Sequence, residues 1–128
     1  AGVPLVHDRP MYGTWSEAWG RTAVKTLLAG TGFDGLICAS DQIARGALDA
    51  LREEGVGVPE DVAVVSFDNW EILATGSRPQ LTSVDMGFES MGRTAAQRLL
   101  GALEGDRSSG VIHHPCRLVV RGSTVPDG

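Results

Sequence analysis

The stretch Val58–Asn69, VPEDVAVVSFDN, decides the fold of this chain. Its apolar run, Val62–Phe67, has the length and the β-branched content of a strand buried on both faces. Asp68 and Asn69 follow the run directly, at the point where the strand is expected to end. The stretch therefore predicts a strand inside a parallel sheet, with polar residues at its carboxyl end.

A second apolar run, Gly35–Ala39 (GLICA), lies upstream and predicts another strand buried on both faces. A helix is predicted between the two strands, from about Gln42 to Glu54, because apolar residues recur there at helical spacing. Ser40 and Asp41 are both residues that cap helices well, and Asp41 is the preferred N-cap. Residues 69–80 contain Gly and Pro breakers and are predicted to be irregular.

The same patterns continue toward both ends of the chain. Upstream, Val3–Val6 predicts a short strand, and a helix is expected from a Ser16 cap to about Ala29. Downstream, a short strand is predicted over Leu81–Val84 and a helix over Phe88–Leu103. One bent strand or two short strands follow within Val111–Val120. The alternation indicates an α/β fold: a parallel sheet flanked by helices on both faces.

Composition excludes several classes of protein. The chain has 128 residues, a net charge of −5 and a single lysine, Lys25, so these residues are not expected to grip DNA themselves. No apolar run reaches the length of a membrane span. Cys38 and Cys116 lie in apolar contexts without a paired spacing, and buried free thiols are favoured over a disulfide.

Candidate ligand-binding residues lie where the predicted strands end, since open α/β sheets bind ligands at that edge. Asp68 could accept hydrogen bonds from the vicinal hydroxyls of a sugar, and Ser40 could donate or accept one. Trp15 could stack on a pyranose ring. The alternatives stay open: Asp68 as a turn residue, and Trp15 as a core residue at helical spacing.

Signatures of catalysis and of cofactor binding are missing from the sequence. It contains no G-x-S-x-G, no P-loop and no G-x-G-x-x-G after a strand. His113 and His114 are adjacent on a predicted strand, so their rings would point to opposite faces and not to one ion. We expect no enzyme activity, no cofactor and no metal.

Several motifs, in order along the chain, resemble those of LacI/GalR-type transcriptional regulators. Residues 39–48 (ASDQIARGAL) resemble the family signature A-N-D-Q-x-A-x-G-A-L, with Ser40 in place of the common Asn. Residues 58–69 resemble the family stretch that begins V-P-x-D and ends F-D-N. The other matching segments are Trp15–Gly20, Pro79–Val84, Met91–Leu100 and Leu118–Thr124.

This resemblance implies the C-terminal part of an effector domain with the periplasmic-binding-protein-like fold of type I. In that family two α/β lobes close around a small molecule, usually a sugar. Residues 1–84 and 118–124 correspond to the second lobe, and residues 87–116 to a segment that returns to the first lobe. The position matching Asp68 is a principal ligand contact, and those matching Trp15 and Ser40 line the cleft.

The resemblance also implies a homodimer that uses the helix matching 42–51 and the loop matching 70–77. We expect Ile43, Ala47, Trp70 and Ile72 at this interface, although Trp70 could equally be tucked locally. The apolar stripe of helix 88–103 (Met91, Ala95, Leu99) would lack its first-lobe partner, which favours self-association, with exchange of this helix between protomers as one route.

The function expected from these residues is that of a cytoplasmic repressor core. It would bind a small-molecule effector and contact operator DNA only through a helix-turn-helix head absent from this chain. A periplasmic sugar-binding protein of a transporter is the alternative with the same fold. A small α/β enzyme is a third candidate, which lacks the nucleophile–base pair or cofactor loop that it would need.

Overall fold

The structure is a computed structural model that describes residues 2, 4–6, 9–30 and 32–125. Helices and strands alternate along it, as the sequence predicts for an α/β fold. The elements are α1 (Glu17–Leu28), β1 (Gly35–Ile37), α2 (Asp41–Glu53), β2 (Ala63–Phe67), α3 (Glu71–Gly76), β3 (Thr82–Asp85), α4 (Phe88–Leu103) and β4 (Arg117–Val119).

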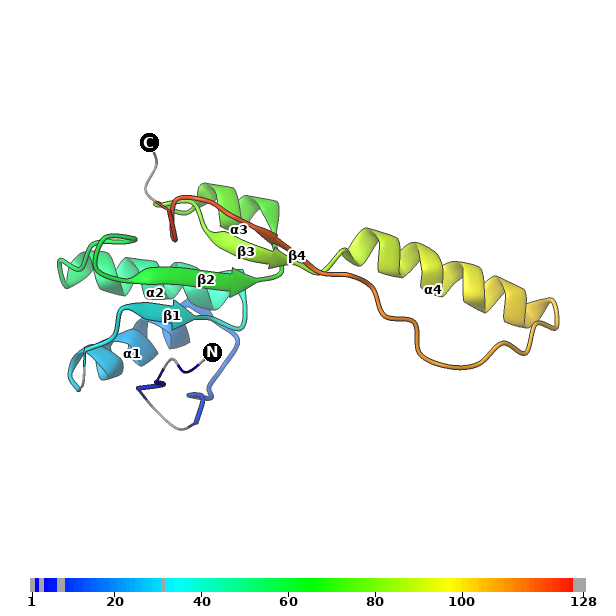
Figure 1. Ribbon diagram of the computed structural model, residues 1–128, viewed down its shortest axis with the longest axis horizontal. Helices are drawn as coiled ribbons and strands as arrows, with labels where there is room; N and C mark the ends of the chain where they lie inside the picture. The colour runs from blue at the N-terminus through cyan, green and yellow to red at the C-terminus, as the bar shows by residue number, and fades with distance from the viewer. Residues whose placement is uncertain (1, 3, 7–8, 31, 126–128) are drawn as a thin grey trace.

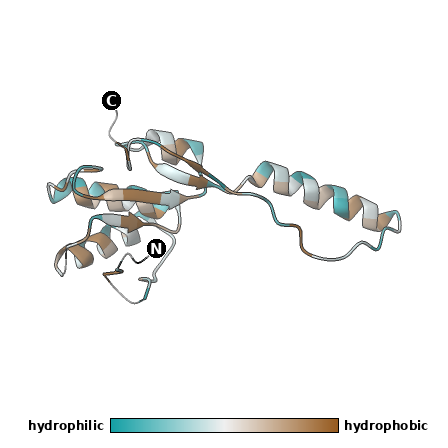
Figure 2. Ribbon diagram, viewed as in Figure 1, coloured by the Kyte–Doolittle hydropathy of each residue, from teal (hydrophilic) through white to brown (hydrophobic). Residues whose placement is uncertain are grey.

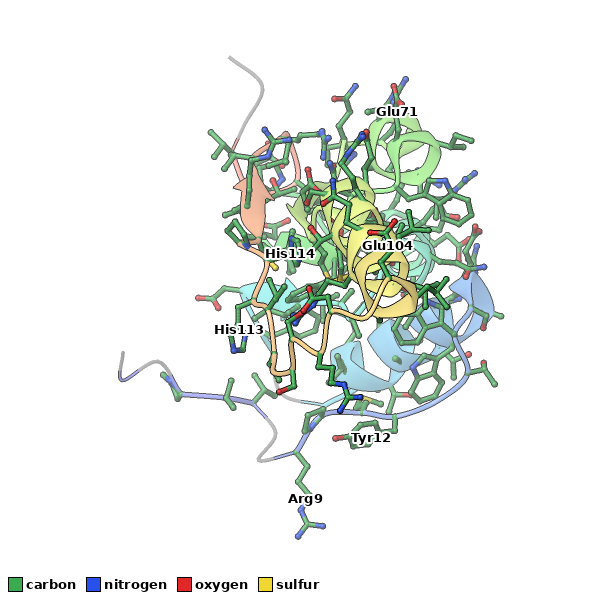
Figure 3. The ribbon with its side chains drawn as sticks, turned by 90° about the vertical axis from the view of Figure 1, so that its right-hand side faces the viewer. Arg9, Tyr12, Glu71, Glu104, His113 and His114 are labelled. Atoms are coloured by element: carbon green, nitrogen blue, oxygen red, sulfur yellow. The ribbon has the colours of Figure 1, made fainter. Side chains whose placement is uncertain are left out.

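The four strands form one sheet in the order β1-β2-β3-β4 (Figure 1). The first three strands are parallel, and β4 runs antiparallel to β3, with Asp85 opposite Arg117. α2 packs on β2, and α1 and α3 pack on α2, so these three helices form one layer on one face of the sheet (Figure 3). The predicted helices on the second face are not found in the described part of the chain.

The core lies between this helix layer and the sheet. Leu51 of α2, Val64 of β2 and Leu81 before β3 are fully buried there, together with Val24 of α1. β2, which contributes to it, is largely brown and hence apolar in Figure 2. Burying such side chains is the main favourable term in folding, so this region supplies the stability of the molecule.

Two glycines set how closely α1 and α2 approach. A Cβ atom at Gly46 would lie 1.9 Å from the carbonyl oxygen of Glu17, and one at Gly20 would lie 2.0 Å from that of Ile43. No side chain fits at either position without moving a backbone. The helices therefore meet through bare backbone, which places the start of α2 firmly against α1.

One part of the chain leaves this packed unit. We call residues 86–116, which comprise α4 and its return segment, the arm, and residues 16–85 with 117–125 the body. The arm projects from the ends of β3 and β4 (Figure 1), and no residue of α4 is buried. The bounds predicted for helix α4 are confirmed. The α4 stripe of Met91, Ala95 and Leu99 is exposed, as expected for a helix that lacks a partner.

Several predictions of local structure are wrong. Residues 4–6 form no strand, and residue 3 lies outside the described residues. β1 is not buried on both faces: it is the outer strand of the sheet, and Ile37 is 76% exposed. β2 alternates between buried and half-buried residues because only one face is covered. The short helix α3 occupies part of the stretch predicted to be irregular.

Both cysteines are free, as predicted, but only Cys38 is buried. Burial raises the pKa of the Cys38 thiol to about 12. Cys116 is exposed because it lies on the return segment of the arm, where nothing covers it, so its predicted burial is wrong. Among the helices of residues 2, 4–6, 9–30 and 32–125, none is long and apolar enough to cross a membrane.

Candidate functional site

A cavity of about 450 Å³ lies where β2 and β3 end and α4 begins. Its position follows from the topology, since the carboxyl ends of β2 and β3 meet at the same edge of the sheet. The residues that line it are Asp68, Asn69, Trp70, Glu71, Asp85, Phe88 and Glu89. Its volume is within the range of small-molecule sites.

Asp68 is the half-buried carboxylate of this cavity. Burial raises its pKa, and the negative charge of nearby Asp41 raises it further. The backbone of Asp41, at the start of α2, acts in the opposite direction and lowers the pKa of Asp68. Asp68 is thus a hydrogen-bond acceptor that is partly shielded from water. The hydroxyl groups of a ligand could replace the water molecules that bond to this carboxylate.

The backbone at Asp68 and Asn69 has left-handed φ values of 102° and 50°. Non-glycine residues avoid this region unless their surroundings hold them there. The Asp68 N–H donates to the Val84 carbonyl (3.1 Å), and the Asn69 N–H donates to Ser83 Oγ (2.9 Å). Both bonds fasten the turn after β2 to β3, so that the Asp68 side chain stays at the cavity.

Carboxylates dominate the electrostatics of the cavity: Asp68, Glu71, Asp85 and Glu89 all line it. Arg117 is paired with Asp85 and Arg93 with Glu89, each at 3.0 Å. The Gly87 N–H, and then Arg117, lower the pKa of Asp85, which favours its charged form. A cavity of this charge repels anions and offers acceptors to a neutral ligand that is rich in hydroxyl groups.

Phe88 adds an apolar ring to this acidic cavity, and the sequence analysis did not single it out. It was assigned only to the helix 88–103, because its spacing fits that helix. The sequence signal for Phe88 is its position three residues after the end of β3. Parallel neighbours such as β2 and β3 end at the same edge of the sheet, so residues that follow β3 lie near Asp68, which follows β2. An aromatic ring beside carboxylates is a common way to bind a sugar.

The other two predicted ligand residues occupy different surroundings. Trp15 precedes α1, is 63% exposed and is not among the residues that line the cavity. Ser40 is fully buried, and its hydroxyl accepts the Ile43 N–H (3.2 Å) as the N-cap of α2. Asp41 is the first residue of the helix and not its cap, so the prediction of Asp41 as the N-cap is wrong. Direct ligand contacts by Trp15 and Ser40 remain predictions.

The predicted interface residues divide into two pairs. Ala47 of α2 is buried, so it is not available to a partner, contrary to the prediction, whereas Ile43 is half-buried and stays a predicted contact. The glycine contacts between the helices explain the burial of Ala47, because they bring α1 over that face of α2. Trp70 and Ile72 are 59% and 71% exposed. Trp70 is thus not tucked into the core.

No cluster of three potential metal ligands occurs within the described ranges. His113 and His114 lie on the irregular return segment of the arm (Figure 3), not on a strand as predicted. The cavity lined by Asp68 and Phe88 is therefore taken from its own geometry as the candidate site.

Residues 2–124 match the family model of the periplasmic binding protein-like domain. The regulator MalR of Streptomyces coelicolor, of the helix-turn-helix type, is 39% identical over 107 residues. That alignment covers 82% of this chain and 30% of MalR, so the chain spans less than a third of this relative's length. Such relatives are named as transcriptional regulators and not as enzymes.

Two solved structures illustrate the match in three dimensions. The transcriptional regulator CelR in complex with cellobiose is 36% identical, with a TM-score of 0.80 over 88% of this chain and 35% of that one. A lac repressor dimer bound to its operator and to an anti-inducer is 33% identical, with a TM-score of 0.81 over 88% of this chain and 34% of that one. The predicted fold, an open and mostly parallel sheet flanked by helices, is confirmed.

Proposed function

Because the chain belongs to the periplasmic-binding-protein-like family, in the form carried by LacI-type regulators, we propose that it is the effector-sensing part of a transcriptional repressor. The effector is a neutral sugar. The observation that carries the proposal is the cavity at the end of β2, which a half-buried carboxylate and an aromatic ring both line.

Each side chain has a distinct part in sugar binding. Asp68 accepts hydrogen bonds from two neighbouring hydroxyls, a geometry that a carboxylate satisfies with both oxygens. Phe88 covers the apolar face of the ring. The carboxylates of the cavity disfavour sugar phosphates, since an anionic group would meet four acidic side chains, of which, among the described residues, only Asp85 and Glu89 are paired with arginines.

The test is a titration of the whole 128-residue chain with cellobiose, sucrose and ribose, followed by amide NMR. Binding is expected to shift the resonances of residues 68–71 and 85–89, and Asp68→Ala is expected to abolish the shifts. Ala29→Ser, outside the cavity, serves as the control substitution. Glucose 6-phosphate is expected to give no shifts. Shifts with the phosphate but not with neutral sugars would contradict the proposal.

We also propose that the arm belongs to the first lobe of the complete domain. This assignment rests on the absence of buried residues in α4 and on the exposed apolar side chains along it, which need a partner. Residues 1–84 and 118–124 then form the second lobe. The operator is contacted by a helix-turn-helix head outside this chain, and the complete repressor acts in the cytoplasm.

A homodimer is the assembly that we propose for this chain. Trp70 and Ile72 form an exposed apolar pair next to α2, and this pair would contribute the body's contact with a partner. The arm offers a second contact by exchange of α4. Sedimentation velocity at tens of micromolar is expected to give a dimer, and Trp70→Ala with Ile72→Ala to weaken it. A monomeric wild-type chain would contradict this assembly.

A further inference from the structure

Asp41, the first residue of α2, has a fully buried carboxylate at the base of the candidate site. Its two oxygens accept hydrogen bonds from three donors. Oδ1 accepts from the hydroxyls of Ser66 (2.5 Å) and Ser83 (2.6 Å), and Oδ2 accepts from the backbone N–H of Trp70 (2.6 Å). Burying a carboxylate is costly unless it is fully hydrogen-bonded, as it is here.

These donors come from three different segments. Ser66 lies on β2, Ser83 on β3, and Trp70 closes the turn after β2. The network continues one step beyond the carboxylate, because Ser83 Oγ also accepts the Asn69 N–H (2.9 Å). Asp41 is thus linked by hydrogen bonds to both backbone N–H groups that follow Asp68: directly to that of Trp70, and through Ser83 to that of Asn69.

The turn needs such support because Asp68 and Asn69 both have left-handed backbones. Arg121 adds a bond from Nη2 to the side-chain oxygen of Asn69 (2.8 Å), but this bond holds a side chain and leaves the N–H groups of Asn69 and Trp70 to the network of Asp41. Without that network, two donors in a half-buried turn would lose their acceptors, and the turn would relax toward ordinary φ values.

We propose that Asp41 is a positioning residue of the effector site: its buried carboxylate holds the Asp68–Trp70 turn in the conformation that presents Asp68 to the ligand. Asp41 does not touch the ligand through its side chain, since that side chain has no exposed surface. The role in binding rests on the proposed function, whereas the role in fixing the turn does not.

Asparagine is the informative replacement because it has the same shape. All three partners of the carboxylate donate, and an amide can offer only its oxygen as an acceptor. If the Asp41→Asn amide nitrogen faces Trp70, two donors oppose each other. If it faces the serines, the Ser83 hydroxyl, which already accepts from Asn69, loses the acceptor of its own proton.

The experiment measures amide hydrogen exchange of the whole chain without ligand. Loss of one hydrogen bond is worth about a tenfold change, so Asp41→Asn is expected to speed exchange of the Asn69 and Trp70 amides by about that factor. Amides of the β2 core, such as Val64, are expected to stay protected. The control is Ser77→Ala, a buried serine whose hydroxyl bonds the Leu73 carbonyl, outside this network.

Ser83 gives a second pair of variants in case Asp41→Asn fails to fold. Ser83→Ala removes the acceptor of the Asn69 N–H, and is expected to speed exchange there, whereas Ser83→Thr keeps the hydroxyl and restores protection. A purely structural role of Asp41 would speed exchange throughout the body by a similar factor and not selectively at the turn. Unchanged protection of residues 69 and 70 in Asp41→Asn, or in Ser83→Ala, would overturn the proposal.

A cellobiose titration of the same variants separates the two hypotheses. If wild type binds and Asp41→Asn binds at least about tenfold more weakly, both stand. If wild type does not bind cellobiose but the turn loosens in Asp41→Asn, the proposed ligand fails while the positioning role stands. If Asp41→Asn binds cellobiose as wild type does, the positioning role fails.

Discussion

The body and the arm contain helices of comparable length with similar apolar stripes, and their surroundings differ completely. In α2 of the body, seven of 13 residues are buried, against α1 on one side and β2 on the other. In α4 of the arm, none of 16 residues is buried. An apolar stripe therefore shows that a helix needs a partner, and not that its own chain contains one.

The difference also separates two sources of order. The body is held by a core that reaches from Val24 to Leu81, so its elements should unfold together. The arm is joined to the body at β3 and β4, and its helix depends on local propensity and on whatever covers it. Paired substitutions, one in each region, can test this division.

The largest difference is expected between two glycines. Gly46→Ala would place a methyl group 1.9 Å from the Glu17 carbonyl oxygen and force α1 away from α2, which costs about 3 kcal/mol, the upper end of the usual overpacking range. Gly92→Ala in the arm meets nothing within 4 Å and gains about 1 kcal/mol of helix propensity. Urea unfolding followed by circular dichroism measures both. A Gly46→Ala protein with a wild-type midpoint would show that the helices meet less closely.

Leucines give the next comparison. Leu51→Ala removes a fully buried side chain of the body and should lower the free energy of unfolding by about 2–5 kcal/mol. Leu99→Ala, on the exposed stripe of the arm, should change it by less than about 0.5 kcal/mol. Both are read from urea titrations monitored by tryptophan fluorescence at low protein concentration. Equal losses would mean that α4 is packed as tightly as α2.

Two carboxylates should respond to pH with opposite signs. The pKa of Asp68, in the body, is raised mainly by burial, so its charged form is disfavoured on folding. Stability from this group is present below its unfolded pKa, about 3.9, and is lost as the pH rises through the higher folded pKa. Asp68→Asn should therefore be more stable than wild type at pH 7, and less so at pH 3.

Asp85, at the root of the arm, has a lowered pKa, first because the Gly87 N–H donates to it and then because of Arg117. Its contribution is present above the unfolded pKa and disappears as the pH falls through the lower folded pKa. Asp85→Asn should thus be less stable than wild type at pH 7, with the difference shrinking in acid. Thermal midpoints between pH 2.5 and pH 7 decide both; shifts of the same sign would contradict the assignment.

The smallest effect is expected for an ion pair on the surface of the arm. Arg93 and Glu89 lie 3.0 Å apart, one turn apart on α4, and both are exposed. Glu89→Gln should reduce the helical circular dichroism slightly at low salt and leave the unfolding midpoint of the body unchanged. The difference should vanish in 1 M NaCl, since salt screens exposed pairs. A shift of the body's midpoint would show that the two regions unfold together.

The sequence predicted best what depends on local pattern. The approximate bounds predicted for α4 match the observed ones, because its apolar spacing runs without a break from Phe88 to Leu103. α3 was missed because six residues between a turn and the breakers Gly76 and Pro79 carry too little periodicity to stand out. Ser40 and Asp41 are both good caps, and sequence alone cannot tell which hydroxyl or carboxylate reaches the helix end.

What escaped prediction depends on contacts between distant segments. Ala47 was predicted at a partner surface by resemblance, and the close approach of α1 and α2 at Gly20 and Gly46 buries it instead. Phe88 joins the candidate site only because β3 ends beside β2. The buried role of Asp41 needs three donors from three segments, an arrangement that no single stretch of sequence contains.

The pairing of Asp85 with Arg117 gives the arm a definite topological status. β3 and β4 are adjacent and antiparallel, which is the geometry of a β-hairpin, and the arm is the loop of that hairpin. The entropic cost of closing a loop rises only with the logarithm of its length. A folded segment such as the arm can therefore replace a short loop with little loss of stability of the sheet. The chain is thus one folded body with the arm inserted between β3 and β4, and a different arm could evolve there without changing the register of the strands.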